Sequence, residues 1–278
     1  MDEKLKILIP TDFSVQAEYA YLMVRKLAEK TPVEIHFLHV LNAPDSITMD
    51  SNENIQSCDD IDIQYLVHQK DIANRKLDNL HVLYSNEIHT HFVLGKLIDS
   101  ILSFAESHEF DLIVMGTKGA WGLKEKLSGS ETQIVARNSR IPLLSLMCDR
   151  SDLNIQNILL VHNFNHPEKE DLQFLHKIIK AFDTRIHLLQ ITSKNVTEVP
   201  NNVMENMNTF AALNDIGNYA CHTISDEDVE DGVIHFNEQN NMDIVCIGTH
   251  GKGGLFHHSA TEKLINHLFK PIISFHLK

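Results

Sequence analysis

Small residues with a regular spacing follow an apolar run in the first half of the chain. Gly116 and Gly119 are separated by two residues, and nine more lead to Gly129 and Ser130, just before a helical stretch at 132–137. Glycine lets backbone N–H groups approach a ligand closely, and N–H groups gathered at a helix N-terminus attract anions. The pattern predicts a site for a phosphate group.

A second polar segment, Pro10-Thr11-Asp12, follows the first apolar run of the chain. In an open parallel sheet, ligands bind beyond the carboxyl ends of the strands, where the winding reverses. We therefore expect this segment and the glycines to meet at one edge of a sheet. Glu131 puts a carboxylate beside the predicted phosphate site, and the three lysines of residues 118–126 could offset its charge.

The chain contains an internal repeat. Four apolar runs of the first half have counterparts in the second, each predicting a buried strand: Lys6–Ser14 with Asn157–Asn165, Glu34–Val40 with Arg185–Ile191, Asp111–Thr117 with Asp243–Thr249, and Ile141–Leu146 with Lys270–Phe275. The first two pairs are 151 residues apart in the sequence and the third pair is 132 apart, so the second half lacks 19 residues between them. The polar excursion at 45–62 of the first half accounts for this difference.

Helical periodicity separates these strands. Apolar residues recur at intervals of three and four within 17–28 and 97–105, and Ser14 is placed to cap the first helix. Strands that alternate with helices predict parallel sheets with right-handed crossovers and helices on both faces. The fold class is therefore α/β, with two doubly wound domains in tandem at 1–148 and 155–278 and a linker near 149–156.

The glycine spacing, together with the repeat, resembles the ATP-binding signature of the universal stress protein family. This resemblance covers nearly the whole chain and implies two five-stranded parallel sheets of a Rossmann-like, adenine nucleotide alpha hydrolase-like kind. It also implies a dimer-forming final strand, which predicts that the strands around Leu144 and Ile273 pair edge to edge within one chain.

The resemblance further implies an adenine-nucleotide site in the first half. The ligand would be ATP, AMP or ADP, with or without Mg²⁺. Asp12 and the backbone of Val40 would hold the adenine and ribose, and Pro10 and Met115 would line the cleft. The residues around the phosphates would be Gly116, Gly119, Gly129, Ser130 and Thr132, with Thr11 and Glu131 adjoining them.

A simpler interpretation is that these glycines only end a strand and cap turns. In the second half, Asn163 stands where Asp12 does in the first, and no Gly-Ser follows Gly251 at the required distance. We therefore predict a degenerate second site.

No metal site is expected. His250, His257 and His258 lie close in sequence, but adjacent histidines rarely face the same way and no acidic cluster completes the set. His36 and His187, within strands, are interpreted as packing or hydrogen-bonded core residues.

Composition limits the partners. The formal charge of −14 disfavours nucleic acid and anionic membranes. No apolar stretch approaches the roughly 20 residues that cross a bilayer, and the start of the chain lacks the apolar core of a signal peptide, so a cytoplasmic protein is expected.

Three functions remain open: a nucleotide-binding regulator of the stress response, a slow ATPase, and a nucleotide-free scaffold. No catalytic set is apparent, which makes an enzyme the weaker alternative. The partners expected are the nucleotide, the second domain as an intramolecular pseudo-dimer, an unidentified protein and a second copy of the chain.

Overall fold

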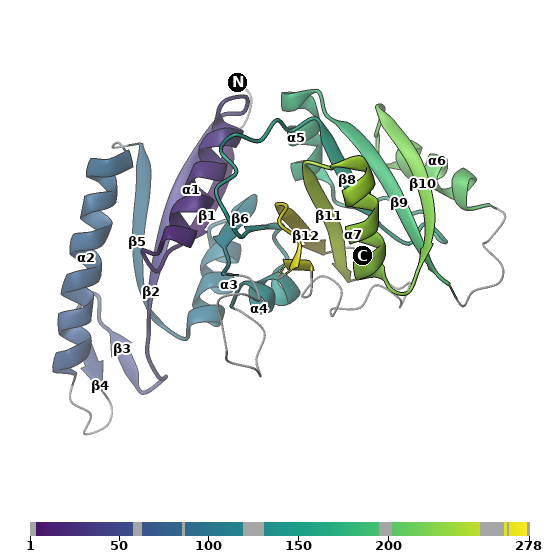
Figure 1. The fold of residues 1–278 in the computed structure, drawn as a ribbon. Helices are drawn as coiled ribbons and strands as arrows, with labels where there is room; N and C mark the ends of the chain where they lie inside the picture. The colour runs from purple at the N-terminus through teal and green to yellow at the C-terminus, as the bar shows by residue number, and fades with distance from the viewer. Residues whose placement is uncertain are drawn as a thin grey trace.

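The computed structural model describes residues 4–57, 63–84, 87–118, 131–194, 202–250, 264–265 and 267–276. Each half contributes five strands to one sheet (Figure 1). The first half supplies β1 (Leu5–Pro10), β2 (Val33–Asn42), β5 (Ile88–Gly95), β6 (Leu112–Gly116) and β7 (Leu143–Leu146). The second supplies β8 (Asn157–Val161), β9 (Arg185–Ser193), β10 (Tyr219–Asp226), β11 (Ile244–His250) and β12 (Ile272–His276).

Both halves have the same topology. The ten-stranded sheet has the order β10-β9-β8-β11-β12-β7-β6-β1-β2-β5, so each half reads identically outward from the centre. In the ten-stranded sheet, every strand pair within a half is parallel. The predicted fold class, two doubly wound five-stranded domains, is confirmed.

Seven helices with described bounds cover the two faces of the sheet: α1 (Val15–Ala28), α2 (Gln64–Tyr84), α3 (Leu97–Ser107), α4 (Glu131–Asn138), α5 (Gln173–Phe182), α6 (Val203–Leu213) and α7 (Val229–Asn240). Residues of α1, α5 and α6 belong to one core cluster, and those of α3, α4 and α7 to the other. Successive strand side chains point to opposite faces, so Ile7 and Ile9 join the first cluster and Leu8 the second. None of the described helices is long and apolar enough to cross a membrane.

The two halves join through their last strands. β7 and β12 pair antiparallel, with Ile273 opposite Leu144, which confirms the predicted edge-to-edge pairing. Both side chains are buried, and the hydroxyls of Ser145 and Ser274 donate across the pair to backbone carbonyls. In Figure 1 the yellow β12 lies in the middle of the molecule, between the two halves. The pairing therefore makes one continuous sheet.

The first helix begins as its sequence predicts. Ser14 is the N-cap of α1, and its hydroxyl accepts a hydrogen bond from the backbone N–H of Ala17. This bond satisfies one of the amides that have no partner inside the helix. The cap fixes where α1 starts relative to the end of β1.

The excursion after β2 is more structured than its composition suggests. Residues Ile47–Met49 (β3) and Ile55–Ser57 (β4) form an antiparallel hairpin beside α2. Ala43, Ile47 and Ile55 are buried in a small core of their own. The interpretation of residues 45–62 as a polar excursion is therefore incomplete, since Ile47 and Ile55 are buried. Isolated apolar residues in a polar background show no periodicity, so the sequence pattern does not reveal them.

Candidate functional site

The winding of the first half reverses between β6 and β1. The chain leaves β1 toward β2, whereas β6, its neighbour on the other side, leads to β7. Such a reversal opens a crevice at the carboxyl ends of the strands. The predicted residues Pro10, Met115 and Val40 lie at or near the ends of β1, β6 and β2. The fold thus brings these three strand ends to one edge.

Gly116 allows α1 to pass close over the end of β6. A Cβ atom at Gly116 would lie 2.0 Å from the backbone carbonyl oxygen of Gln16, in the first turn of α1. Real Cβ atoms do not approach backbone that closely, so glycine is required here by packing. Gly116 is the last residue of β6, as the simpler interpretation expects, and its requirement for glycine comes from the contact with α1. The same close approach places the N-terminal turn of α1 at the crevice.

The segment after β1 is held by local hydrogen bonds. The Thr11 N–H donates to the Leu38 carbonyl, and the Thr11 hydroxyl accepts from the Phe13 N–H. Asp12 is exposed, and its Oδ1 accepts from the Ser14 N–H at 2.9 Å. Phe13 has a φ of 64°, in the left-handed region, which turns the chain sharply into α1. These bonds fix the direction of the Asp12 carboxylate.

His39 is a residue of this edge that the sequence analysis missed. Its Nδ1 donates to the Thr11 carbonyl at 2.8 Å, and its ring lies 4.7 Å from that of Phe13. Burial is the main cause that lowers the pKa of His39, and the Lys76 charge lowers it further. Lys76 also lies over the Phe13 ring. A histidine in a predicted buried strand gives no sequence signal that separates it from a core residue.

The start of α4 closes the other side of the edge. Thr132 is buried, and its hydroxyl donates to the Gly116 carbonyl at 3.4 Å. The Glu131 residue is exposed, but the protein around it displaces part of the water from its carboxyl, which is the main cause that raises its pKa. The Asp12 carboxylate raises this pKa further, and Lys118 opposes the shift. Asp12, Glu131 and Lys118 therefore act electrostatically on one another. Among the described residues, the edge carries the two carboxylates of Asp12 and Glu131 and the ammonium groups of Lys118 and Lys76.

Three predicted phosphate ligands, Gly119, Gly129 and Ser130, lie outside the described residues. The described part therefore contains the strand ends and the first turn of α4, and the glycine loop between them stays a sequence prediction. The histidines His257 and His258 also lie outside the described residues.

The same edge in the second half differs in chemistry. His162, Asn163 and Phe164 occupy the places of Thr11, Asp12 and Phe13. The Asn163 Oδ1 accepts from the Asn165 N–H, which repeats the turn that Asp12 makes, but without a charge.

Aromatic side chains pack around the segment after β8, unlike the corresponding segment after β1. Phe164 is fully buried against Phe210, with ring centroids 5.1 Å apart. His162 packs on both rings, and burial lowers its pKa to about 4. The segment after β8 is therefore anchored in the core, whereas Phe13 is only half-buried.

Comparison with known proteins places the chain in a family. The family model for the universal stress protein family matches residues 5–146, half of the chain. Two universal stress proteins of Methanocaldococcus jannaschii are each 28% identical, over 139 and 149 residues; the alignments cover 50% of this chain and 79% and 92% of those relatives. The protein belongs to the universal stress protein family.

The fold is shared over the full length with a solved structure. A universal stress protein from Archaeoglobus fulgidus superposes on 98% of this chain and 96% of its own, with a TM-score of 0.71 and 19% sequence identity. This likeness extends the fold to both halves, in agreement with the repeated strand order.

Proposed function

We propose that the chain is an adenine-nucleotide-binding regulatory protein of the stress response, with its ligand in the domain formed by residues 1–148. ATP, or AMP or ADP, would bind at the edge where β6, β1 and β2 end. The domain of residues 155–278 would bind no nucleotide and would serve as the partner of the first. Membership of the universal stress protein family and the glycine spacing support this proposal.

One observation carries it: Asp12, Gly116, Thr132 and the buried Val40 lie at the carboxyl edge of the first half, where the winding reverses. This edge offers a carboxylate for a ribose or a bound cation, and it lies at the start of the glycine spacing. A phosphate chain would extend toward residues 119–130, with Mg²⁺ as a candidate to offset the charges of Asp12 and Glu131.

The test is calorimetry on nucleotide-free protein titrated with Mg-ATP. We expect one ATP per chain for the wild type and no measurable binding for Gly129→Glu, because a carboxylate would enter the phosphate loop. Gly217→Ala is the matched control, since its Cβ would meet no atom within 4 Å and it lies in the other half. If Mg-ATP gives no binding heat and no thermal shift with the wild-type protein, the proposal is contradicted.

A nucleotide-free scaffold is the second candidate, and the antiparallel pairing of β7 with β12 favours it. That pairing needs no ligand and already gives the chain a dimer-like core. Mass spectrometry of small molecules released from denatured, purified protein distinguishes the two: an adenine nucleotide supports the first function, and its absence together with silent calorimetry supports the scaffold.

A further inference from the structure

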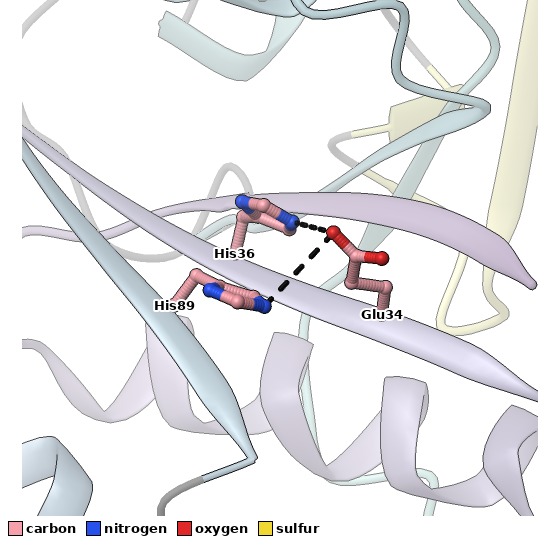
Figure 2. Close-up of side chains that lie close together, drawn as sticks. All are labelled: Glu34, His36 and His89. Carbon is pink, nitrogen blue, oxygen red and sulfur yellow. Dashed lines mark hydrogen bonds and ion pairs between the residues drawn. The ribbon is translucent and has the colours of Figure 1, made fainter.

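Three potential metal ligands gather at the opposite end of the first half. Glu34 and His36 alternate on β2 and so point to the same face of the sheet, and His89 lies directly across from His36 on the edge strand β5. The place is near the amino-terminal ends of the strands, away from the carboxyl edge described above. Figure 2 shows both imidazole rings facing the Glu34 carboxylate.

The ligand atoms are close to the separations that a bound ion requires. The Oε1 of Glu34 lies 2.7 Å from the Nε2 of His36 and 3.9 Å from the Nε2 of His89. All three groups offer an atom within 4.8 Å of the other two. Ligand atoms about 2.1 Å from a tetrahedral zinc ion lie about 3.4 Å from one another. Shifts of less than about 1.5 Å therefore complete the arrangement.

His36 is held in place by its surroundings. Its Nδ1 is 2.9 Å from the Nε2 of His91, and its ring packs edge-on against Phe110. A histidine that binds a metal almost always makes a hydrogen bond through its other nitrogen, which fixes the ring orientation. With an ion on Nε2, neutral His36 carries its proton on Nδ1 and donates a hydrogen bond through it to the Nε2 of His91. Neutral His91 then carries its own proton on Nδ1.

The three side chains differ in freedom. Their exposed fractions are 9% for His36, 37% for Glu34 and 55% for His89. The rings of His36 and His89 are stacked 4.5 Å apart, so His89 must turn about its side-chain bonds to bring its nitrogen and an ion into one plane. Because His89 is exposed, core packing does not hinder this rotation.

One fixed cation opposes the site. Lys6 is close enough to affect the charges of Glu34 and His36. Its ammonium group donates to the His108 carbonyl at 2.7 Å and lies over the Phe110 ring, which holds it beside the cluster. The carboxylate of Glu34 compensates part of this repulsion for an incoming cation.

The second half contains the same framework but the counterpart of only one of the three ligands, His36. His187 and His222 repeat the His36 and His91 pair, with nitrogens 3.0 Å apart and rings nearly parallel. Ala220 lies across from His187, in the place of His89. Arg185 stands where Glu34 does. The paired histidines are thus a shared structural feature, and the two additional ligands occur in the first half alone.

We propose that Glu34, His36 and His89 bind a divalent transition-metal ion of the zinc class. Two imidazole nitrogens and one carboxylate oxygen suit zinc, whereas Mg²⁺ and Ca²⁺ take mainly oxygen ligands. Three protein ligands leave one position for water. The ion would tie the edge strand β5 to β2, independently of any nucleotide.

The test is a titration of chelator-treated, full-length protein with Zn²⁺, followed by calorimetry, with a parallel titration with Mg²⁺. We expect His89→Ala to weaken one zinc equivalent by about 100-fold or more, and Glu34→Gln to weaken the same equivalent. Both side chains are on the surface, and circular dichroism checks that the variants fold. Co²⁺ in place of zinc should give visible absorption bands that His89→Ala removes.

Two comparisons make the experiment specific. His68→Ala removes an exposed histidine of α2 outside the cluster and should leave zinc binding unchanged. Arg185→Glu combined with Ala220→His copies the ligands into the second half and should add one equivalent. The proposal is contradicted if His89→Ala binds zinc as tightly as the wild type does, or if His68→Ala loses as much zinc affinity as His89→Ala. It is also contradicted if Mg²⁺ binds as tightly as Zn²⁺, or if the double variant binds no additional zinc equivalent.

Discussion

The two halves of the chain share a framework and differ in the side chains at its ends. Strand order, parallel pairing and the pair of stacked histidines on the two outermost strands of each half are the same in both. At the carboxyl edge, the exposed Asp12 of the first half contrasts with the neutral Asn163 of the second, and the half-buried Phe13 with the fully buried Phe164. Duplication has kept the residues that the sheet needs, while the residues able to contact ligands have diverged.

The largest expected difference between the halves concerns the equivalent phenylalanines. Phe164→Ala should lower the free energy of unfolding by about 3–5 kcal/mol, because it empties a closed site against Phe210. Phe13→Ala should cost about 1 kcal/mol, since this side chain is already partly in water. Urea unfolding of both variants measures the two effects. Equal losses would show that the two segments are packed alike.

Acid should weaken the second half through His162, whereas Thr11, its counterpart, has no titratable group. Burial lowers the pKa of His162 from its ordinary value of 6.5 to about 4. A histidine with a lowered pKa binds its proton less readily when folded, so stability is fully present above pH 6.5 and decreases as the pH falls toward 4. Integrated over this range, the loss is at most about 3 kcal/mol.

The variant His162→Gln isolates this contribution, because other histidines with lowered pKa values, such as His91 and His187, remain in both proteins. We expect unfolding experiments between pH 4 and 7 to show a flatter pH dependence for His162→Gln than for the wild type. Parallel curves for the two proteins would mean that His162 is accessible to protons in the folded state.

The smallest expected effect concerns charge at the carboxyl edge of the first half. Glu131 and Asp12 repel each other, so Glu131→Gln should strengthen binding of metal-free ATP by about two- to fivefold, as expected for an exposed charge pair. Glu106→Gln, an exposed carboxylate of α3, is the control and should change nothing. Calorimetry at low salt measures the difference in ATP affinity. Weaker ATP binding by Glu131→Gln than by the wild type would contradict the prediction and would show that the Glu131 carboxylate promotes binding.

The strands with continuous apolar runs could be predicted from the sequence, and so could the pairing of the strands around Leu144 and Ile273. Strands β5 and β10 could not be predicted from an apolar run. Their polar side chains alternate at the edges of the sheet, where one face is partly open, so His89 and His91 break the apolar pattern. Periodicity detects buried faces and is weak at an edge.

The candidate sites show the same limit. The places of Asp12 and Gly116 at the strand ends could be predicted because both come at the end of apolar runs, and Gly116 is explained by its contact with Gln16. His39 and the cluster of Glu34, His36 and His89 could not be found, because their contacts depend on the register between β2 and β5. Register is a property of the folded sheet, and spacing along one chain does not contain it.

The covalent link between the halves changes how the central strand pair responds to dilution. β7 and β12 share only three opposing residue pairs, and in separate molecules such a contact would dissociate at low protein concentration. Tethered partners experience an effective concentration in the millimolar range, whatever the amount of protein in the cell. The link also fixes the composition of the pair, so within a chain a half that carries Asp12 always lies beside a half that carries Asn163. Separate domains could instead form pairs with two Asp12 carboxylates or with no such carboxylate.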